Sequence, residues 1–243
     1  MIAQATDRGN REHNEDYHVC KTIADGTLLM VADGLGGHRG GKFAAHYFCA
    51  AVAAQLADFA GALRQTTEAT LHKMVRSAAE SMQARIATEH PGLNPRTTVA
   101  MAWLTADGTW TLHVGDSRFY LFGPEGMKFR TRDHSVAQLL VDQGEIKEHE
   151  MAHHPDQATL LRSIGGRKSP KPTITPLEAL RPDEGVLLCS DGFWGAVKVP
   201  EMQLLLTGES LQTILEQLVS IAVARACPNS DNVTAIFARP RPD

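Results

Sequence analysis

The 243-residue sequence predicts an α+β fold built on a largely antiparallel sheet, and three observations lead to that prediction. Short apolar and β-branched runs follow one another through tight turns, such as Asp107-Gly108, and consecutive hairpins make a sheet antiparallel. Two long segments with helical character lie next to each other between clusters of strands. Strands and helices therefore do not alternate one by one, as they would in a parallel βαβ fold.

Four helices are predicted from the spacing of apolar residues. Residues 66–90 place Leu71, Met74 and Ala78 at steps of three and four, which is the period of one helix face. Residues 210–226 repeat the pattern, begin at the capping residue Ser210 and stop before a proline. A helix at 42–63 is apolar on most faces and is expected to be the most buried, and residues 136–143 form a short helix.

Strands are predicted where β-branched or large apolar residues form short runs. These runs occupy residues 27–32, 97–104, 109–114, 119–122, 186–189 and 233–238. Residues 135–182 are a mixed stretch with a short helix followed by His, Pro, Gly and Lys residues, and we expect them to form a flap over a site. We see no repeat or linker, so residues 1–243 are predicted to form a single domain.

Composition and charge exclude several classes of protein. Lys plus Arg number 24 against 28 Asp plus Glu, the formal net charge is −4 and no basic run stands out, which argues against nucleic-acid or anionic-membrane partners. The apolar stretch 43–63 is interrupted by polar residues and the N-terminus lacks the order of a signal peptide, so we expect no membrane span and no export. The four cysteines are far apart, which predicts reduced thiols in a cytoplasm.

Four acidic residues stand where predicted apolar strands begin or end: Asp33, Asp116, Asp191 and Asp231. An antiparallel sheet brings the start of one strand beside the end of its neighbour, so these carboxylates are predicted to meet at one rim. Like charges crowded there repel one another unless a cation neutralises them. Oxygen ligands, including the backbone carbonyl of Gly34, suit Mg²⁺ or Mn²⁺ better than zinc.

Other patterns have simpler interpretations. The Asp-Gly pairs at 25–26 and 107–108 are interpreted as tight turns alone. The segment from Gly36 to Lys42 fits the phosphate-binding pattern G-x-x-x-x-G-K, but Phe43 replaces the hydroxyl residue that this motif needs. Its glycines are expected instead to let the backbone pass close to a metal ion before a helix begins. The eleven histidines show no ligand spacing, and most are interpreted as structural or exposed.

Six motifs run through the sequence in a fixed order. They are DRGNR with NED within 7–16, VADGLGGH at 31–38, VGDSR at 114–118, TRDHS at 131–135, CSDGFW at 189–194 and SDNVT at 230–234. In this order they resemble the metal-dependent Ser/Thr protein phosphatases of type 2C, the PPM family, over essentially the whole chain. The resemblance implies a four-layer αββα sandwich of two antiparallel β-sheets flanked by helix pairs, with a flap near the site.

The resemblance also implies which residues hold the ions. Asp33 would bridge two Mn²⁺ or Mg²⁺ ions, and the Gly34 carbonyl would complete the ligands of one of them. Asp191 and Asp231 would hold the other ion. Asp116 would bind a weaker third ion.

The remaining implied roles concern the reaction, which is the hydrolysis of phosphoserine and phosphothreonine in proteins. Arg11 would grip the substrate phosphate through a planar two-point contact, and Glu15 and Asp16 would bind the ions directly or through water. Two neighbouring cations lower the pKa of a bridging water, so that the metal-bridging hydroxide attacks phosphorus in line without a covalent intermediate. No cysteine is needed, so Cys189 is predicted to be a bystander. The implied partners are phosphorylated proteins, including a cognate Ser/Thr kinase or its targets.

Two positions depart from the family pattern. Gly195 stands where members often have a second acid for the third ion, so that ion is expected to bind weakly or differently. Leu35 stands where eukaryotic members carry a histidine that is a candidate general acid, and His38 is out of register with it. The leaving-group proton would then come from another group or from a metal-bound water.

Two other hypotheses are compatible with the same motifs. One is a catalytically silent metal-binding or interaction module built on this fold. Degenerate members usually lose the metal acids or the arginine, whereas Arg11, Asp33, Asp191 and Asp231 are all present here. The other is a phosphatase of a small phosphorylated metabolite, which would share the site and differ only in the flap and the surface.

Overall fold

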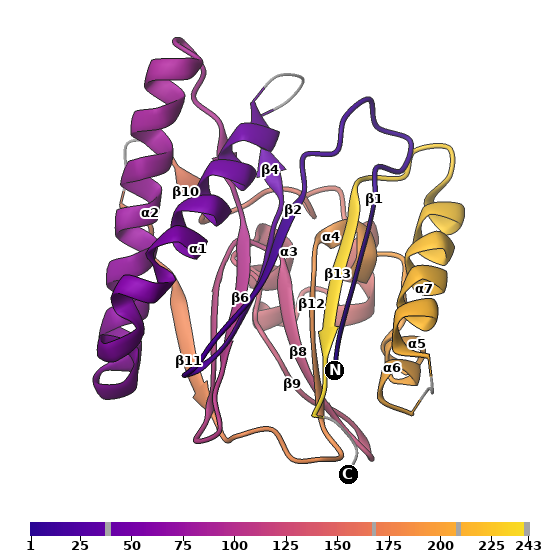
Figure 1. Ribbon diagram of the computed structural model, residues 1–243. Coiled ribbons are helices and arrows are strands. Elements are labelled where there is room, and N and C mark those ends of the chain that lie inside the picture. Colours follow the sequence, from indigo (N-terminus) through magenta and orange to yellow (C-terminus); the bar gives the residue numbers. More distant parts are fainter. Residues whose placement is uncertain (37–39, 167–168, 208–209, 241–243) are drawn as a thin grey trace.

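Two five-stranded antiparallel sheets form the centre of the computed structural model, which describes residues 1–36, 40–166, 169–207 and 210–240 (Figure 1). The first sheet has the order β1 (Ile2–Asp7), β13 (Val233–Ala238), β12 (Gly185–Cys189), β8 (Arg118–Gly123) and β9 (Gly126–Arg130). The second has the order β11 (Thr173–Leu177), β7 (Thr109–Val114), β6 (Val99–Leu104), β3 (Gly26–Ala32) and β2 (Tyr17–Ile23). The short strands β10 (Ile164–Gly165), β5 (Arg96–Thr97) and β4 (Gly34–Leu35) form a third, smaller sheet.

The two large sheets pack face to face through alternate residues of their central strands. In β3, Leu29 and Val31 lie between the sheets, whereas Leu28 and Met30 face the helices on the outside. The same alternation holds for Leu188 in β12, which lies between the sheets. A strand covered on both faces needs no polar side chain, which explains why these strands read as unbroken apolar runs in the sequence.

Helices cover the outer faces of both sheets. The helices α1 (Gly41–Gln65) and α2 (Thr67–Glu89) pack on each other and on the second sheet (Figure 1). The first sheet is covered by α7 (Leu211–Ala226) with the one-turn helices α4 (Asp191–Trp194), α5 (Val199–Met202) and α6 (Leu204–Thr207). The predicted α+β fold and its αββα layers are confirmed, although one outer layer is a single long helix with short ones rather than a pair of long helices.

Helix α1 is long and apolar enough, over Gly41–Leu63, to cross a bilayer by length and composition alone. A core helix of a globular domain meets the same two criteria. Its residues Ala45, Phe48 and Val52 are fully buried in the cluster that joins α1 to α2 and the second sheet. Packing within this domain therefore accounts for part of the apolar character of α1.

The predicted helices and strands are present, except that the single strand predicted at 97–104 is divided between β5 and β6, which belong to different sheets. Four longer strands were missed. All four are edge strands: β1 and β9 are the edges of the first sheet, and β2 and β11 are the edges of the second. Edge strands are less covered and carry polar residues, and β11 contains Pro176, a residue that is tolerated at sheet edges.

The predicted flap, residues 135–182, is wrong at its C-terminal end, because β11 pairs with β7 as part of the second sheet. Before it lie α3 (Val136–Gln143) and the 3₁₀ helix η1 (Glu148–His153). The predictions that concern residues 37–39, including His38 in the Gly-rich loop, lie outside the described residues.

Candidate metal centre

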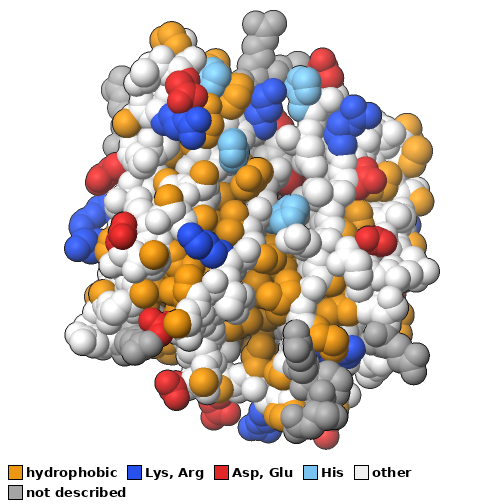
Figure 2. All heavy atoms as spheres, viewed as in Figure 1, with side chains coloured by type: hydrophobic (Ala, Val, Ile, Leu, Met, Phe, Trp, Pro, Cys, Tyr) orange, Lys and Arg blue, Asp and Glu red, His pale blue; other side chains and the backbone are white. Residues whose placement is uncertain are grey.

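Five carboxylates lie at the ends of strands of the two large sheets. They belong to Asp16 before β2, Asp33 after β3, Asp116 after β7, Asp191 after β12 and Asp231 before β13. The fold therefore brings together the four acids that the strand pattern predicted to meet, and it adds Asp16. Figure 2 shows histidine side chains in the upper half of one face of the molecule and a mainly hydrophobic area in its middle, with charged side chains at the upper and lower edges.

The charges of these acids act on one another. Burial raises the pKa of Asp33 well above its usual range, and the charges of Asp16, Asp191, Asp116 and Asp231 raise it further. The pKa of Asp116 is raised by burial and then by the charge of Asp191. The pKa of Asp191 is raised by burial and then by the charge of Asp231. This arrangement is costly without a positive charge among the acids, and a divalent cation would relieve it.

Asp16 provides the clearest test of whether a cation fits. Its Oδ2 accepts a hydrogen bond from Ser190 Oγ at 2.7 Å, whereas its buried Oδ1 has no hydrogen-bond partner in the structure. Burial, followed by the charges of Asp191 and Asp231, raises its pKa from 3.8 to about 7 despite that hydrogen bond. A buried carboxylate oxygen without a partner, beside other acids, fits a Mg²⁺ or Mn²⁺ ion or its water ligands.

The carboxylates form a ring of acids rather than a closed cage. Within the described residues, no three His, Cys, Asp or Glu side chains come close enough to a common point to hold an ion by themselves. Mg²⁺ is usually bound in proteins through one or two carboxylates and keeps several water ligands. The donor set therefore suits partly hydrated ions of this class.

Two glycines let the backbone approach closely at the predicted ligands. A Cβ on Gly34 would lie 2.3 Å from the carbonyl carbon of Gly41 and 2.7 Å from the backbone oxygen of Glu15. A Cβ on Gly192 would lie 2.2 Å from the backbone oxygen of Asn232. Real Cβ atoms do not approach so closely, so each Asp-Gly pair here requires its glycine for packing.

The loop that carries Arg11 is fixed to the C-terminal motif. Arg11 Nη2 donates to Asp231 Oδ2 at 2.8 Å, and its side chain is 58% exposed, so further donors of the guanidinium face solvent. Asn232 accepts a hydrogen bond from the backbone N–H of Glu15 at 2.8 Å and donates to the backbone oxygens of Arg8 and His13. Asn232 holds the loop in place, and sequence reasoning did not single it out although it follows Asp231 directly.

The predicted residues differ in how they join the cluster. Asp16 and Asp116 are buried, Asp33 and Asp191 are half-buried, and Asp231 is half-buried while paired with Arg11. The carboxylate of Glu15 lines a neighbouring groove and lies close to the start of α1, since a Cβ on Gly41 would lie 2.7 Å from Glu15 Oε2.

The two departures from the family pattern and the predicted bystander also have a place in the structure. Gly195 donates its N–H to the backbone oxygen of Asp191 at 2.8 Å and supplies no carboxylate beside Asp116. Leu35 lies in β4, next to Gly34. Burial raises the pKa of the Cys189 thiol, so it stays protonated near neutral pH, as a bystander would.

One residue of the predicted flap reaches the site. Gln157, between η1 and β10, donates from Nε2 to Asp191 Oδ2 at 3.2 Å. A neutral amide that donates to an acid fixes the orientation of the carboxylate without adding charge. The sequence pattern carried no signal for this contact, because it joins residues 34 positions apart through the tertiary fold.

We expect Gln157→Leu to weaken Mn²⁺ binding about tenfold, because partners that orient metal-binding carboxylates contribute on this scale. Isothermal titration calorimetry with Mn²⁺ measures the change directly. The matched control is Gln217→Leu, at an exposed position on α7, which should bind Mn²⁺ as the wild type does. Equal affinity in the two variants would show that Gln157 does not position Asp191.

The described site has clear relatives among known proteins. A family model described as "Protein phosphatase 2C" matches residues 3–227. The serine/threonine protein phosphatase PstP of Mycobacterium tuberculosis is 33% identical over 238 residues, which cover 97% of this chain and 44% of that protein. The serine/threonine phosphatase stp of Listeria innocua is 31% identical over 245 residues, which cover 96% of this chain and 92% of that protein.

Solved structures agree with these matches. The phosphatase Stp1 of Staphylococcus aureus superimposes with a TM-score of 0.85 at 25% identity and covers 99% of this chain and 95% of its own. The catalytic domain of PstP in complex with two manganese ions superimposes with a TM-score of 0.78 at 29% identity, covering 98% of this chain and 96% of its own. The chain therefore spans less than half of the full mycobacterial relative but nearly all of its solved catalytic domain.

Proposed function

Because the chain belongs to the protein phosphatase 2C family, we propose that it is a metal-dependent phosphatase that hydrolyses phosphoserine and phosphothreonine in proteins. The observation that carries this proposal is the group of acids whose pKa values are raised, beside the exposed guanidinium of Arg11; these acids are Asp16, Asp33, Asp116 and Asp191. The proposed substrates are phosphorylated proteins, supplied by a Ser/Thr kinase of the same cell, and the proposed location is the cytoplasm. The spaced, unpaired cysteines support that location.

We assign the proposed ligands from the predicted roles and the placement of the side chains. Asp33 with the Gly34 carbonyl, Asp191 and Asp231 would hold two divalent ions, and Asp116 would contribute to a weaker third. When bound, such ions act as Lewis acids that withdraw charge from the phosphoryl oxygens and make water a better nucleophile near neutral pH. Ser190 keeps one oxygen of Asp16 in a hydrogen bond, and the other oxygen, which has no hydrogen-bond partner, is available to an ion or to its water ligands.

Arg11 has the chemistry to bind the substrate phosphate. The guanidinium presents several N–H donors in one plane, of which the structure uses one on Asp231. A phosphate dianion accepts two parallel hydrogen bonds from such a plane, which orients its phosphorus as well as attracting its charge. Arg11 therefore supplies positioning that an ammonium group would not reproduce.

The proposed function predicts turnover of a phosphoserine peptide in the presence of Mn²⁺, measured as released inorganic phosphate, and its loss on addition of a chelator. Arg11→Ala should reduce kcat/KM about tenfold to a hundredfold, the contribution of a charge-assisted hydrogen bond. Arg8→Ala, in the same loop but with its guanidinium donating to the backbone oxygen of Glu12 rather than to Asp231, is the matched control and should retain nearly full turnover. Mn²⁺ binding without hydrolysis of any phosphomonoester would favour the silent module instead, and turnover that persists after chelation would refute metal dependence.

A further inference from the structure

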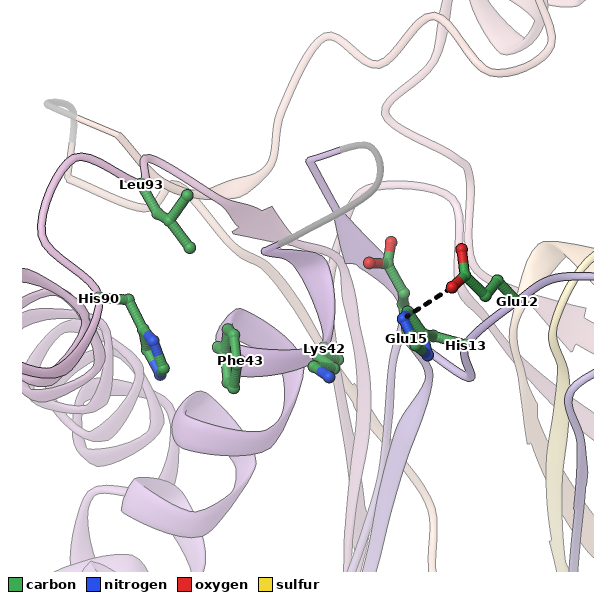
Figure 3. Close-up of a pocket in the computed structure, with 7 residues that line it drawn as sticks. All are labelled: Glu12, His13, Glu15, Lys42, Phe43, His90 and Leu93. Atoms are coloured by element: carbon green, nitrogen blue, oxygen red, sulfur yellow. Dashed lines mark ion pairs between the residues drawn. The ribbon is translucent and has the colours of Figure 1, made fainter.

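A groove of about 550 Å³ opens beside the metal centre (Figure 3). Three segments far apart in the sequence line it: the loop before β2, the first turn of α1 and the chain after α2. Its lining residues are Glu12, His13, Glu15, Lys42, Phe43, His90 and Leu93. A volume of this size accommodates a short segment of an extended ligand such as a peptide.

The groove is charged at one end and apolar at the other. Figure 3 shows Glu12, His13 and Glu15 at one end, Phe43, His90 and Leu93 at the other, and Lys42 between them. The rings of Phe43 and His90 are stacked, with centroids 3.7 Å apart and an interplanar angle of 20°. The apolar end is therefore a wall of two half-buried rings and the half-buried side chain of Leu93.

The charged end of the groove is continuous with the metal centre. The backbone N–H of Glu15 donates to Asn232, the residue after Asp231, at 2.8 Å. The first turn of α1 lies against Gly34, because a Cβ on Gly41 would lie 2.5 Å from the carbonyl oxygen of Gly34. A phosphorylated residue bound at the acids would thus carry its neighbouring residues over this groove.

Lys42 makes the groove compatible with a phosphorylated chain. Its Nζ lies 5.1 Å from the centroid of the Phe43 ring, and within the described residues it forms no ion pair with an acid. Its positive charge partly offsets Glu12 and Glu15, which would otherwise repel an anionic substrate.

We propose that this groove binds the peptide chain beside the phosphorylated residue and selects substrates with a large apolar or aromatic side chain at that position. The inference rests on the proposed phosphatase function and adds a substrate preference to it. The selected side chain would pack on Phe43, His90 and Leu93, removing apolar surface of both partners from water. A small aryl phosphate carries no neighbouring residues that could lie in the groove, so it provides the reference substrate.

The test is the ratio of kcat/KM for a phosphoserine peptide to kcat/KM for p-nitrophenyl phosphate. The peptides are Ala-rich and carry one Leu or Phe, moved in steps along either side of the phosphoserine. In the wild type, one position should raise the ratio about tenfold over the all-Ala peptide, the scale on which one buried apolar side chain discriminates. Phe43→Ala and Leu93→Ser, on different segments, should each remove most of that preference.

The matched control is Phe59→Ala. Phe59 is also on α1 and also has a lysine over its ring, with Lys73 Nζ at 5.5 Å, but it lies 16 residues further along, about 24 Å of helix from Phe43. Phe59→Ala should keep the wild-type preference. Equal ratios for all peptides, or an unchanged preference in folded Phe43→Ala and Leu93→Ser, would overturn the inference. Absence of hydrolysis of every substrate by the wild type would instead refute the proposed phosphatase.

Discussion

Asp191→Asn should reduce Mn²⁺-dependent turnover at least about a hundredfold, yet should make the metal-free protein more stable than the wild type. The activity falls because a neutral amide is a poor ligand for a divalent ion. The stability rises because Asp191 lies among acids whose burial and mutual repulsion raise their pKa values, and the substitution removes one of those charges. We expect a gain of about 1–3 kcal/mol, the cost of a buried polar group without full compensation, and several degrees in Tm.

Thermal unfolding in a chelator, followed by the same measurement in Mn²⁺, tests both parts of this prediction. Mn²⁺ should raise the Tm of the wild type more than that of Asp191→Asn. Asp107→Asn, the same substitution at an exposed turn between β6 and β7, should behave as the wild type in activity and stability. A destabilised metal-free Asp191→Asn would show that Asp191 is held by structural contacts rather than strained by its neighbours.

The metal-free protein should lose stability from the Asp16 carboxyl as the pH rises from about 4 to about 7. The pKa of Asp16 is raised from 3.8 in the unfolded chain to about 7 in the fold, so the folded state binds the proton more tightly over this window. The stability that this group contributes is present at the low end and is lost as the pH rises through its folded pKa. Mn²⁺ competes with the same proton, so its apparent affinity should rise over the same window.

Urea unfolding at pH 5 and pH 7.5, with a chelator or with Mn²⁺, measures this linkage. His134 affects the stability with the opposite sign, because burial lowers its pKa to about 3. The stability that His134 contributes is lost as the pH falls below 6.5, the pKa of an ordinary histidine. The relevant quantity is therefore the difference in pH dependence between the wild type and Asp16→Asn, which His134 does not affect. Mn²⁺ at about a hundred times its dissociation constant should add about 2.7 kcal/mol to the wild type. Identical pH profiles for the two proteins would contradict the raised pKa of Asp16.

Sequence reasoning predicted the central strands and long helices, because both are signalled by local apolar patterns. The runs that became β3 and β12 are covered on both faces, and α2 keeps a regular step of buried residues such as Leu71 and Met82. It missed the edge strands β1 and β11, where pairing with one neighbour does not demand an apolar pattern. It also placed the flap too far toward the C-terminus for the same reason.

Sequence reasoning predicted the acids of the candidate site but missed the residues that form hydrogen bonds with them. Asp33 and Asp191 could be predicted because each follows the apolar run of a strand, and Asp231 because it precedes one. No sequence pattern singles out Gln157 or Ser190, because their role depends on a hydrogen bond to a carboxylate that only the fold brings within reach.

By itself the sequence determined which residues stand at the strand ends, and thus that acids in a fixed order would gather at one rim. Those are local properties, since an apolar run followed by an acid is visible without knowing its neighbours. Only the tertiary structure decided how the acids affect one another, because a pKa depends on burial and on the distance to charges from other strands. It placed Asp16 in contact with Ser190, 174 residues away, and left one of its oxygens without a partner. It also assembled the groove, whose wall joins the start of α1 to the chain after α2 and exists only when both helices have packed on the sheet.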